Sequence, residues 1–134
     1  MPTTTVRWVT GKQFVGTDAN NHSIVLSGDN PHTGMSPSQL LLISLSACTA
    51  VDVLNIMEKK RKPLSILEII AQGEQDPDPP WTYQRIVLTF RVSGKEVTEK
   101  ALSQAVQLSQ EKYCSVAATV RGVAKIEVRL EIVA

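Results

Sequence analysis

The chain has 134 residues, of which 43% are hydrophobic and 20% are charged, and its formal net charge is +1. This length suits one compact domain with its own hydrophobic core, so we expect residues 1–134 to form a single domain that needs no disulfide to hold it together. The small net charge excludes a general electrostatic attraction to nucleic acid or to anionic membranes.

The N-terminal region predicts three short β-strands followed by a loop. Apolar and polar residues alternate over 5–9, and further apolar runs lie at 13–16 and 23–26. Turn-forming glycine, asparagine and aspartate residues separate these runs, which indicates a β meander. Residues 28–34 are rich in the same residue types, and we expect them to form a loop.

A long apolar helix is predicted next. Ser36 can cap a helix that has Pro37 in its first position, and the pattern continues to about Lys60. Basic residues at its end suit the negative pole of the helix dipole, and we expect Pro63 to end it. Because residues 40–51 are apolar on nearly every side, the helix needs cover all round, part of which we expect from a second chain. Interrupting polar residues argue against a membrane span.

Two strands, a second helix and a final strand complete the expected chain. Residues 64–75 and 84–93 predict strands, the latter with a strict alternation between a dry and a wetter face. Residues 96–112 have helical periodicity, 113–118 form a short connecting segment, and 125–133 predict a strand. The expected buried stripe of the second helix consists of Val97, Ala101, Ala105 and Leu108. This order predicts an α+β domain with an antiparallel sheet.

Cys48 and Cys114 are the two cysteines of the chain, and the residues alone leave three interpretations open. They can be a structural disulfide, two inert buried thiols or a reactive pair, and packing is the commonest role for either cysteine alone. Their spacing is not that of a CxxC motif. A zinc site needs about four ligands, and His22 and His32 lie in expected turns, so we predict neither a metal nor a cofactor.

Two segments carry a resemblance to a known family. The first is Ser36-Pro-Ser-Gln-Leu-Leu-Leu-Ile-Ser-Leu-Ser-Ala-Cys-Thr-Ala-Val-Asp-Val53, and the second is Leu108-Ser-Gln-Glu-Lys-Tyr-Cys-Ser-Val116. In this order and separation they resemble the OsmC/Ohr family, named for osmotically inducible protein C and organic hydroperoxide resistance protein. The Cys-Thr-Ala sequence followed by Asp52 is similar to the YhfA-like branch of that family.

The resemblance implies an OsmC-like fold in which a long central helix is buried within an intertwined homodimer. It also implies a thiol peroxidase that reduces organic hydroperoxides in the response to oxidative stress. In that cycle Cys48 becomes a sulfenic acid, Cys114 resolves it as a disulfide, and a dithiol reductant of the lipoyl type restores both thiols. The long apolar side chains expected around Cys48 suit a fatty or aromatic peroxide; they are Leu41, Leu45 and Val51.

The sequence departs from the hydroperoxide-reducing members at the groups that activate the thiolate. Those members have a glutamate after the motif proline and an arginine in the first hairpin, whereas this chain has the uncharged Ser38 at the first position. Asp52, one helical turn beyond Cys48, either disfavours the thiolate or orients a basic residue against it. The candidates for that basic residue are Arg7, Arg61 and Arg121. Glu111, in the second motif, is a further polar residue that we expect to support the pair.

Two functions remain open from the sequence. The first is a cytoplasmic thiol peroxidase acting on organic hydroperoxides, because residues 1–6 lack the basic and apolar pattern of a signal peptide. The second is a catalytically weak OsmC-like protein that binds an apolar ligand or partner in the pocket of the dimer. Neither function involves nucleic acid or a membrane.

Overall fold

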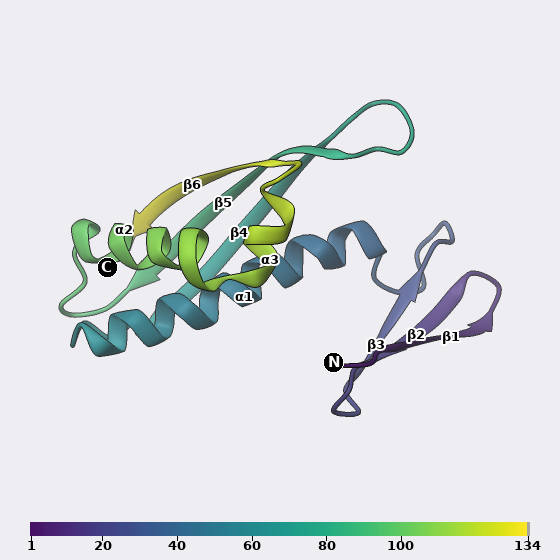
Figure 1. The fold of residues 1–134 in the computed structure, drawn as a ribbon, viewed down its shortest axis with the longest axis horizontal. Coiled ribbons are helices and arrows are strands. Elements are labelled where there is room, and N and C mark those ends of the chain that lie inside the picture. The colour runs from purple at the N-terminus through teal and green to yellow at the C-terminus, as the bar shows by residue number, and fades with distance from the viewer. Residues whose placement is uncertain (134) are drawn as a thin grey trace. The chain divides into compact units, whose positions relative to one another are not determined.

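A computed structural model describes residues 1–133 and divides the chain into two compact units, each with its own sheet. The first unit comprises Met1–Leu41 and the second begins at Leu42. Figure 1 shows the elements along the chain. They are β1 (Thr5–Thr10), β2 (Gln13–Thr17), β3 (Ser23–Ser27), α1 (Pro37–Lys59), β4 (Ile66–Gln75), β5 (Tyr83–Ser93), α2 (Glu99–Leu108), the π-helix η1 (Ser109–Tyr113), α3 (Ser115–Val120) and β6 (Lys125–Ile132).

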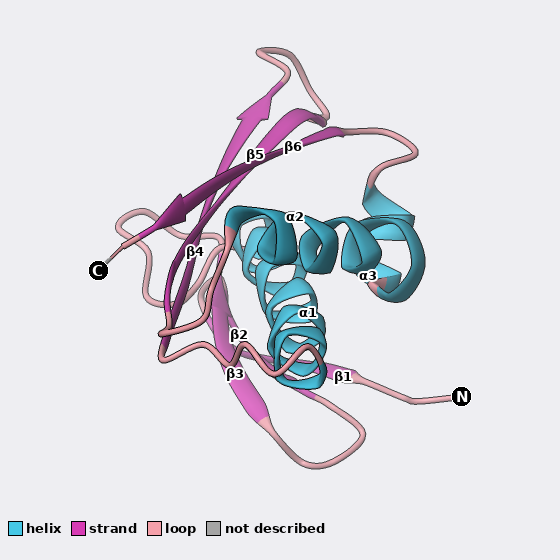
Figure 2. Cartoon of the chain, turned by 90° about the vertical axis from the view of Figure 1, so that its left-hand side faces the viewer, coloured by secondary structure: helices cyan, strands magenta, loops and turns pink. Residues whose placement is uncertain are grey.

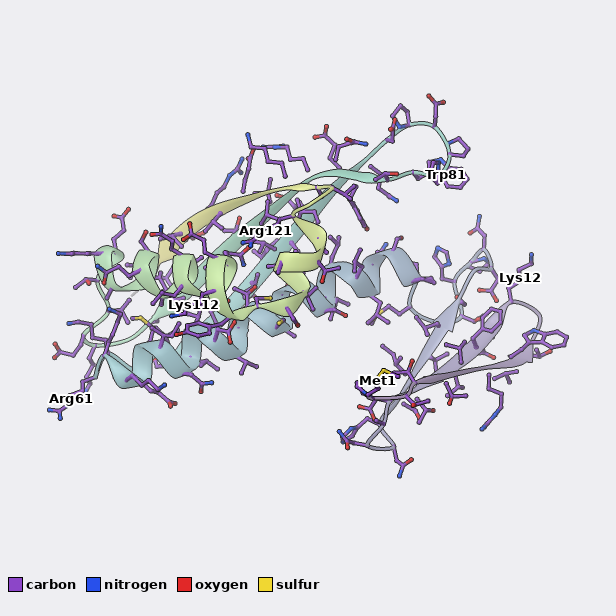
Figure 3. All side chains as sticks on the ribbon, viewed as in Figure 1. Met1, Lys12, Arg61, Trp81, Lys112 and Arg121 are labelled. Carbon is purple, nitrogen blue, oxygen red and sulfur yellow. The ribbon has the colours of Figure 1, made fainter. Side chains whose placement is uncertain are left out.

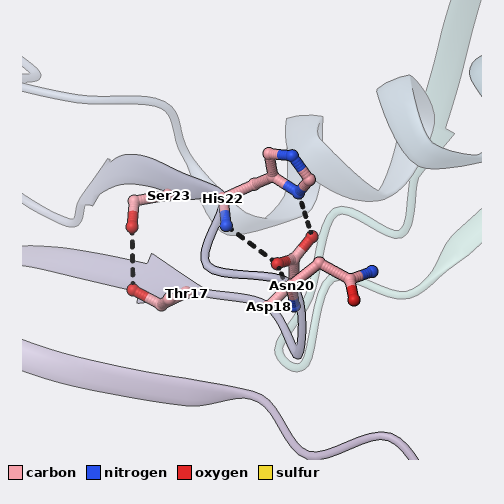
Figure 4. Close-up of polar contacts among 5 residues, drawn as sticks. All are labelled: Thr17, Asp18, Asn20, His22 and Ser23. Carbon is pink, nitrogen blue, oxygen red and sulfur yellow. Dashed lines mark hydrogen bonds and ion pairs between the residues drawn. The ribbon is translucent and has the colours of Figure 1, made fainter.

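The first unit contains a three-stranded antiparallel sheet in the order β1-β2-β3. The three strands confirm the predicted meander, and each is one residue longer than predicted. Gly11 has a φ of 54° in the β1–β2 turn, where Trp8 Nε1 donates to its carbonyl oxygen at 2.7 Å. In the β2–β3 turn, the Asp18 carboxylate accepts from the backbone N–H groups of Asn20 and His22, and it also pairs with the His22 ring (Figure 4). Local side-chain hydrogen bonds therefore set both turns.

The ends of α1 follow from residues at its two caps. Ser36 Oγ accepts from the backbone N–H of Gln39 at 3.4 Å, which confirms the predicted start of the helix. The helix ends at Lys59, because Arg61 adopts a left-handed φ of 57° that no helix can continue through. The predicted end near Lys60 is confirmed, but the chain leaves the helix at the left-handed Arg61, two residues before Pro63, so the role predicted for Pro63 is wrong.

Within the described chain, α1 is buried along one stripe. The buried residues recur at every fourth position, as one face of a helix requires, and they are Leu45, Thr49, Val53 and Met57. Side chains on other faces are 38 to 58% exposed, and they are Leu41, Ile43, Val51 and Leu54. By length and composition α1 could cross a bilayer, with a mean hydropathy of 2.0. Its buried stripe nevertheless packs into the hydrophobic core of the second unit, together with β5 and α2.

The second unit contains a three-stranded sheet in the order β4-β5-β6, with helices on one face (Figure 2). The central strand confirms the predicted alternation, and its fully buried residues are Ile86, Leu88, Phe90 and Val92. Strands β4 and β5 are antiparallel, but β5 and β6 are parallel. The prediction of a purely antiparallel sheet is wrong for this pair. The chain between β5 and β6 runs through α2, η1 and α3, and a helical crossover of this kind returns a strand in the parallel direction.

The predicted second helix at 96–112 is divided into α2 and η1, and α3 occupies the predicted connecting segment. Thr98 caps α2, with its hydroxyl accepting from the backbone N–H of Ala101 at 3.1 Å. Ala101 and Ala105 are buried as predicted, but Leu108 is 40% exposed. The buried face also includes Leu102 and Val106, and Val97 packs against the core as predicted. The division between α2 and η1 and the helical form of α3 were not predicted.

Candidate redox site

The two cysteines lie together in the second unit, which the sequence spacing alone could not predict. Cys48 is half-buried in the middle of α1, and Cys114, 2% exposed, lies between η1 and α3. Cys48 packs against the buried cluster that contains Cys114, and its proximity raises the pKa of the Cys114 thiol. Two distant segments of the chain therefore bring two free thiols close together.

The π-helix η1 sets the position of Cys114. Cys114 leaves the helical conformation with φ −80° and ψ 107°, and its backbone N–H donates to the carbonyl oxygen of Ser109 at 2.8 Å. Its Sγ then accepts from the backbone N–H of Ala117 at 3.3 Å, so the thiol caps the first turn of α3. Single turns of π-helix are frequent at functional sites, because the extra residue redirects one side chain. Here that side chain is the buried thiol.

Burial raises the pKa of the Cys114 thiol above its ordinary value, and the neighbouring Cys48 raises it further. The backbone N–H of Ala117 and the hydroxyl of Thr49 act in the opposite direction, because both donate to the sulfur and favour its charged form. Burial is the largest effect, so Cys114 stays protonated at neutral pH. A protonated, buried thiol suits a group that reacts after its neighbour.

A buried polar chain reaches Cys114 from α1 and η1. Thr49 is fully buried, and its Oγ1 lies 3.0 Å from the carbonyl oxygen of Leu45 and 3.7 Å from Cys114 Sγ. Gln110 Nε2 donates to the same hydroxyl oxygen at 2.9 Å. Arg121 in turn donates to the backbone carbonyl oxygen of Gln110 at 2.8 Å. The Thr49 hydroxyl is thus held from three sides next to the sulfur.

Asp52 connects α1 to η1. It follows Cys48 by one helical turn, as predicted, and its Oδ2 accepts from the hydroxyl of Ser109 at 2.8 Å. Ser109 is fully buried, so this bond satisfies a hydroxyl that would otherwise be costly to bury. Among residues 1–133, no lysine or arginine forms an ion pair with Asp52. The carboxylate therefore accepts from Ser109 and not from an arginine, which was one of the two roles that the sequence left open.

The three arginines that the sequence offered as partners of Asp52 lie exposed or contact other groups. Arg7 is exposed on β1 in the first unit. Arg61 lies beyond the last turn of α1, where its side chain points outward (Figure 3). Arg121 contacts the backbone of Gln110. Within the part of the chain that the structure describes, no hydrogen bond joins an arginine or lysine to either sulfur.

The remaining candidate residues lie on the surface. Ser38 is exposed in the first turn of α1, within the first unit. Glu111 is exposed on η1, where its Oε1 accepts from Gln107 Nε2 at 3.3 Å. His22 and His32 are exposed in turns, as predicted.

A groove of about 420 Å³ lies in the second unit. It lies between the α2–η1 segment and β6, and its residues are Ser103, Val106, Gln107, Gln110, Glu111, Arg121, Ile126, Val128 and Leu130. Gln110 belongs both to this lining and to the polar chain that reaches Cys114. The apolar strand residues and the polar helix residues give the groove the mixed lining that is typical of small-molecule sites.

Sequence reasoning missed Thr49, Ser109 and Gln110 as parts of the site. The signal that could have found them is a polar residue adjacent to a cysteine in an otherwise apolar helix, as Thr49 is to Cys48. Buried polar side chains need partners, so such a residue indicates a second polar group packed against it. Which group that is depends on the tertiary structure.

The comparisons with known proteins agree with this fold. The family described as OsmC-like protein matches residues 28–129. Protein YhfA of Escherichia coli strain K12 is 34% identical over 129 residues, which cover 96% of each chain. The crystal structure of a hypothetical protein from Aquifex aeolicus VF5 is 30% identical with a TM-score of 0.90, covering 99% of this chain and 96% of that chain. The organic hydroperoxide resistance protein OhrB of Bacillus subtilis is 19% identical with a TM-score of 0.67, over 98% of each chain.

The fold and the paired thiols define a small α+β protein with the architecture of these relatives. The match extends over most of the chain, including both cysteine segments. The chain belongs to the OsmC-like family.

Proposed function

We propose that the protein is a thiol peroxidase that reduces organic hydroperoxides with Cys48 and Cys114. The observation that carries the proposal is that the two free thiols are close neighbours, one half-buried and one buried. The name of the OhrB relative, an organic hydroperoxide resistance protein, supports the same class of substrate. We place this activity in the cytoplasm, where free thiols persist.

The reaction follows from the different surroundings of the two sulfurs. Cys48, the more accessible thiol, attacks the outer oxygen of the hydroperoxide, which breaks the O–O bond and leaves an alcohol and a Cys48 sulfenic acid. Cys114 then attacks the Cys48 sulfur, a disulfide forms, and the sulfenic oxygen leaves as water. A dithiol of the lipoyl type reduces the disulfide by exchange and becomes a cyclic disulfide itself.

We propose further that two copies of the chain assemble as an intertwined homodimer around α1. The support is the set of apolar α1 residues that the chain leaves exposed, which comprises Leu41, Ile43, Val51 and Leu54. Contiguous exposed apolar surface of this kind marks an interaction site. The second copy covers this apolar surface.

The peroxidase proposal is tested by mixing the reduced protein with cumene hydroperoxide in a stopped-flow instrument. We expect rapid loss of both free thiols, and a protein mass lower by two hydrogens once the disulfide has formed. Cys114→Ser should stop at a Cys48 sulfenic acid, which dimedone traps as one adduct. Cys48→Ser should not react faster than free cysteine. Wild-type oxidation no faster than that of free cysteine contradicts the proposal.

A second candidate function is the binding of an apolar ligand without fast catalysis. The groove beside η1 favours it, and so does the lack of a bonded cation at either sulfur among residues 1–133. This function predicts that Cys48→Ser binds a fluorescent fatty acid as tightly as the wild type does, while the wild type oxidises slowly. Fluorescence titration of both proteins decides between the two functions.

A further inference from the structure

The hydroxyl of Thr49 has one proton and two acceptors. The carbonyl oxygen of Leu45 lies 3.0 Å from Oγ1, and Cys114 Sγ lies 3.7 Å from it. A neutral thiol is a weak acceptor, so the carbonyl oxygen takes the proton when Cys114 is protonated. A thiolate is a charged acceptor and forms a much stronger bond. Rotation about the Thr49 C–O bond therefore lets the hydroxyl donate to the carbonyl oxygen when Cys114 is neutral. When Cys114 is a thiolate, the hydroxyl donates to its sulfur.

The neighbours of Thr49 hold its oxygen in place for this exchange. Gln110 Nε2 donates to Oγ1 at 2.9 Å, and the Gln110 backbone accepts from Arg121 at 2.8 Å. Because Gln110 already occupies the oxygen as a donor, the hydroxyl proton must point to one of the two acceptors. The side chain is fully buried, so water does not compete for it. Gln110 is thus a positioning residue for the Thr49 hydroxyl.

The exposure of the two sulfurs decides which of them becomes charged during reduction. Cys48 is half-buried, whereas Cys114 is 2% exposed. A reductant thiolate reaches the Cys48 side of a disulfide between them, and exchange expels the sulfur that is not attacked. Cys114 is therefore the leaving group, and the rate depends on how well its thiolate is stabilised.

We propose that Thr49 stabilises the Cys114 thiolate when a dithiol reductant opens the Cys48–Cys114 disulfide, which rests on the proposed redox function of the pair. The reductant thiolate forms a bond to Cys48 Sγ, the Cys48–Cys114 bond breaks, and its electron pair stays on Cys114 Sγ. The Thr49 hydroxyl and the Ala117 N–H donate to this sulfur. The second thiol of the reductant gives its proton to Cys114 and expels Cys48 by closing the cyclic disulfide.

The charged groups nearby are engaged elsewhere. On α1, Asp52 accepts from Ser109, and after α3, Arg121 donates to the backbone of Gln110. Cys48 is a disulfide sulfur at this stage and carries no charge. The two hydrogen-bond donors are therefore the groups that determine the stability of the thiolate, and Thr49 is the one that a substitution can remove.

The test starts from the disulfide made with diamide, so that it does not depend on reaction with a hydroperoxide. Dihydrolipoamide then reduces the protein, and acid quenching followed by mass analysis gives the rate. We expect Thr49→Val, which keeps the shape but lacks the hydroxyl, to be reduced about tenfold more slowly than the wild type. Thr49→Ser, the matched control, should stay close to the wild-type rate. Gln110→Met should show a smaller slowing in the same direction.

A second measurement separates this role from a role in packing. In a Cys48→Ala background, the pKa of Cys114 is measured from the ultraviolet absorbance of the thiolate. Adding Thr49→Val should raise it by about one pH unit, and adding Thr49→Ser should not. Loss of packing alone lowers the melting temperature without this difference between valine and serine.

The outcomes distinguish the two proposals. Disulfide formation with diamide but not with cumene hydroperoxide overturns the peroxidase and leaves the reduction rates to decide the role of Thr49. Failure to form the disulfide at all overturns both. Equal reduction rates for Thr49→Val and Thr49→Ser overturn the role of Thr49. If Thr49→Val does not fold, a wild-type rate for Gln110→Met overturns it instead.

Discussion

The two sides of α1 have similar sequences and different surroundings. One stripe is buried by the sheet and α2, and it consists of Leu45, Thr49, Val53 and Met57. The other side is equally apolar but exposed, with Val51 at 58% and Ile43 at 48%. A helix that is apolar all round needs cover all round. The exposed apolar side is the reason for the proposed contact between two copies of the chain.

The largest expected effect is on the free energy of unfolding, and it comes from shortening a side chain of the buried stripe of α1. Leu45→Ala removes most of a fully buried side chain, and the cavity it leaves should lower the free energy of unfolding by about 2–5 kcal/mol. Urea denaturation followed by circular dichroism measures it. Glu58→Ala, exposed near the end of the same helix, is the control and should change stability by less than about 0.5 kcal/mol. Similar values for both would show that the stripe is not a core.

A charged substitution on the exposed side of α1 should change the oligomeric state of the protein. Val51→Glu places a charge in the centre of the proposed contact between two copies, where burial without a partner is unfavourable. We expect the molecular mass in sedimentation equilibrium to fall from that of a dimer toward that of a monomer. Lys59→Glu, which also adds a negative charge at an exposed site of α1, should remain dimeric. A wild-type protein that is monomeric at all concentrations contradicts the dimer.

The polar residues beside the buried stripe should show a coupled effect. Asp52→Ala leaves the fully buried hydroxyl of Ser109 without its acceptor, and we expect a loss of about 1–3 kcal/mol. Ser109→Ala in the same protein removes the unsatisfied group, so the double variant should lose less than the sum of the two single variants. Urea denaturation of the four proteins completes the cycle. Strict additivity would mean that this hydrogen bond does not connect α1 to η1.

The smallest effect is expected far from α1, among the polar side chains of the second sheet. Arg85 donates two hydrogen bonds to Glu127 and, together with Lys125, lowers the pKa of that carboxylate from its ordinary value of 4.5 to about 2. The unfolded chain therefore binds more protons than the folded chain between these values. The stabilisation is complete above 4.5 and disappears as the pH falls toward 2.

The measurement is the urea midpoint of the wild type and of Glu127→Gln across this range. Their difference should shrink on acidification, whereas Glu96→Gln, an exposed glutamate after β5, should not show this change. A constant difference between the wild type and Glu127→Gln would show that the ion pair has no effect on stability.

Local patterns predicted most of the elements of the fold. The alternation in β5 identified the buried Ile86 and Phe90, and Ser36 identified the start of α1, because period and capping depend on near neighbours. The parallel pairing of β5 with β6 was missed, since strand direction depends on how the whole crossover is routed. Leu108 was wrongly predicted to be buried, because the burial of an apolar residue depends on which elements pack against it.

For the site, the sequence by itself determined the two thiols, the one-turn relation of Asp52 to Cys48, and the resemblance that connects them. Only the tertiary structure decided that Cys114 lies next to Cys48. It also decided that Ser109 donates to the Asp52 carboxylate and that Thr49 lies beside the Cys114 sulfur. Helical spacing is a property of consecutive residues, whereas a contact between distant segments forms when their elements pack together. The chemistry of the pair depends on those packed contacts.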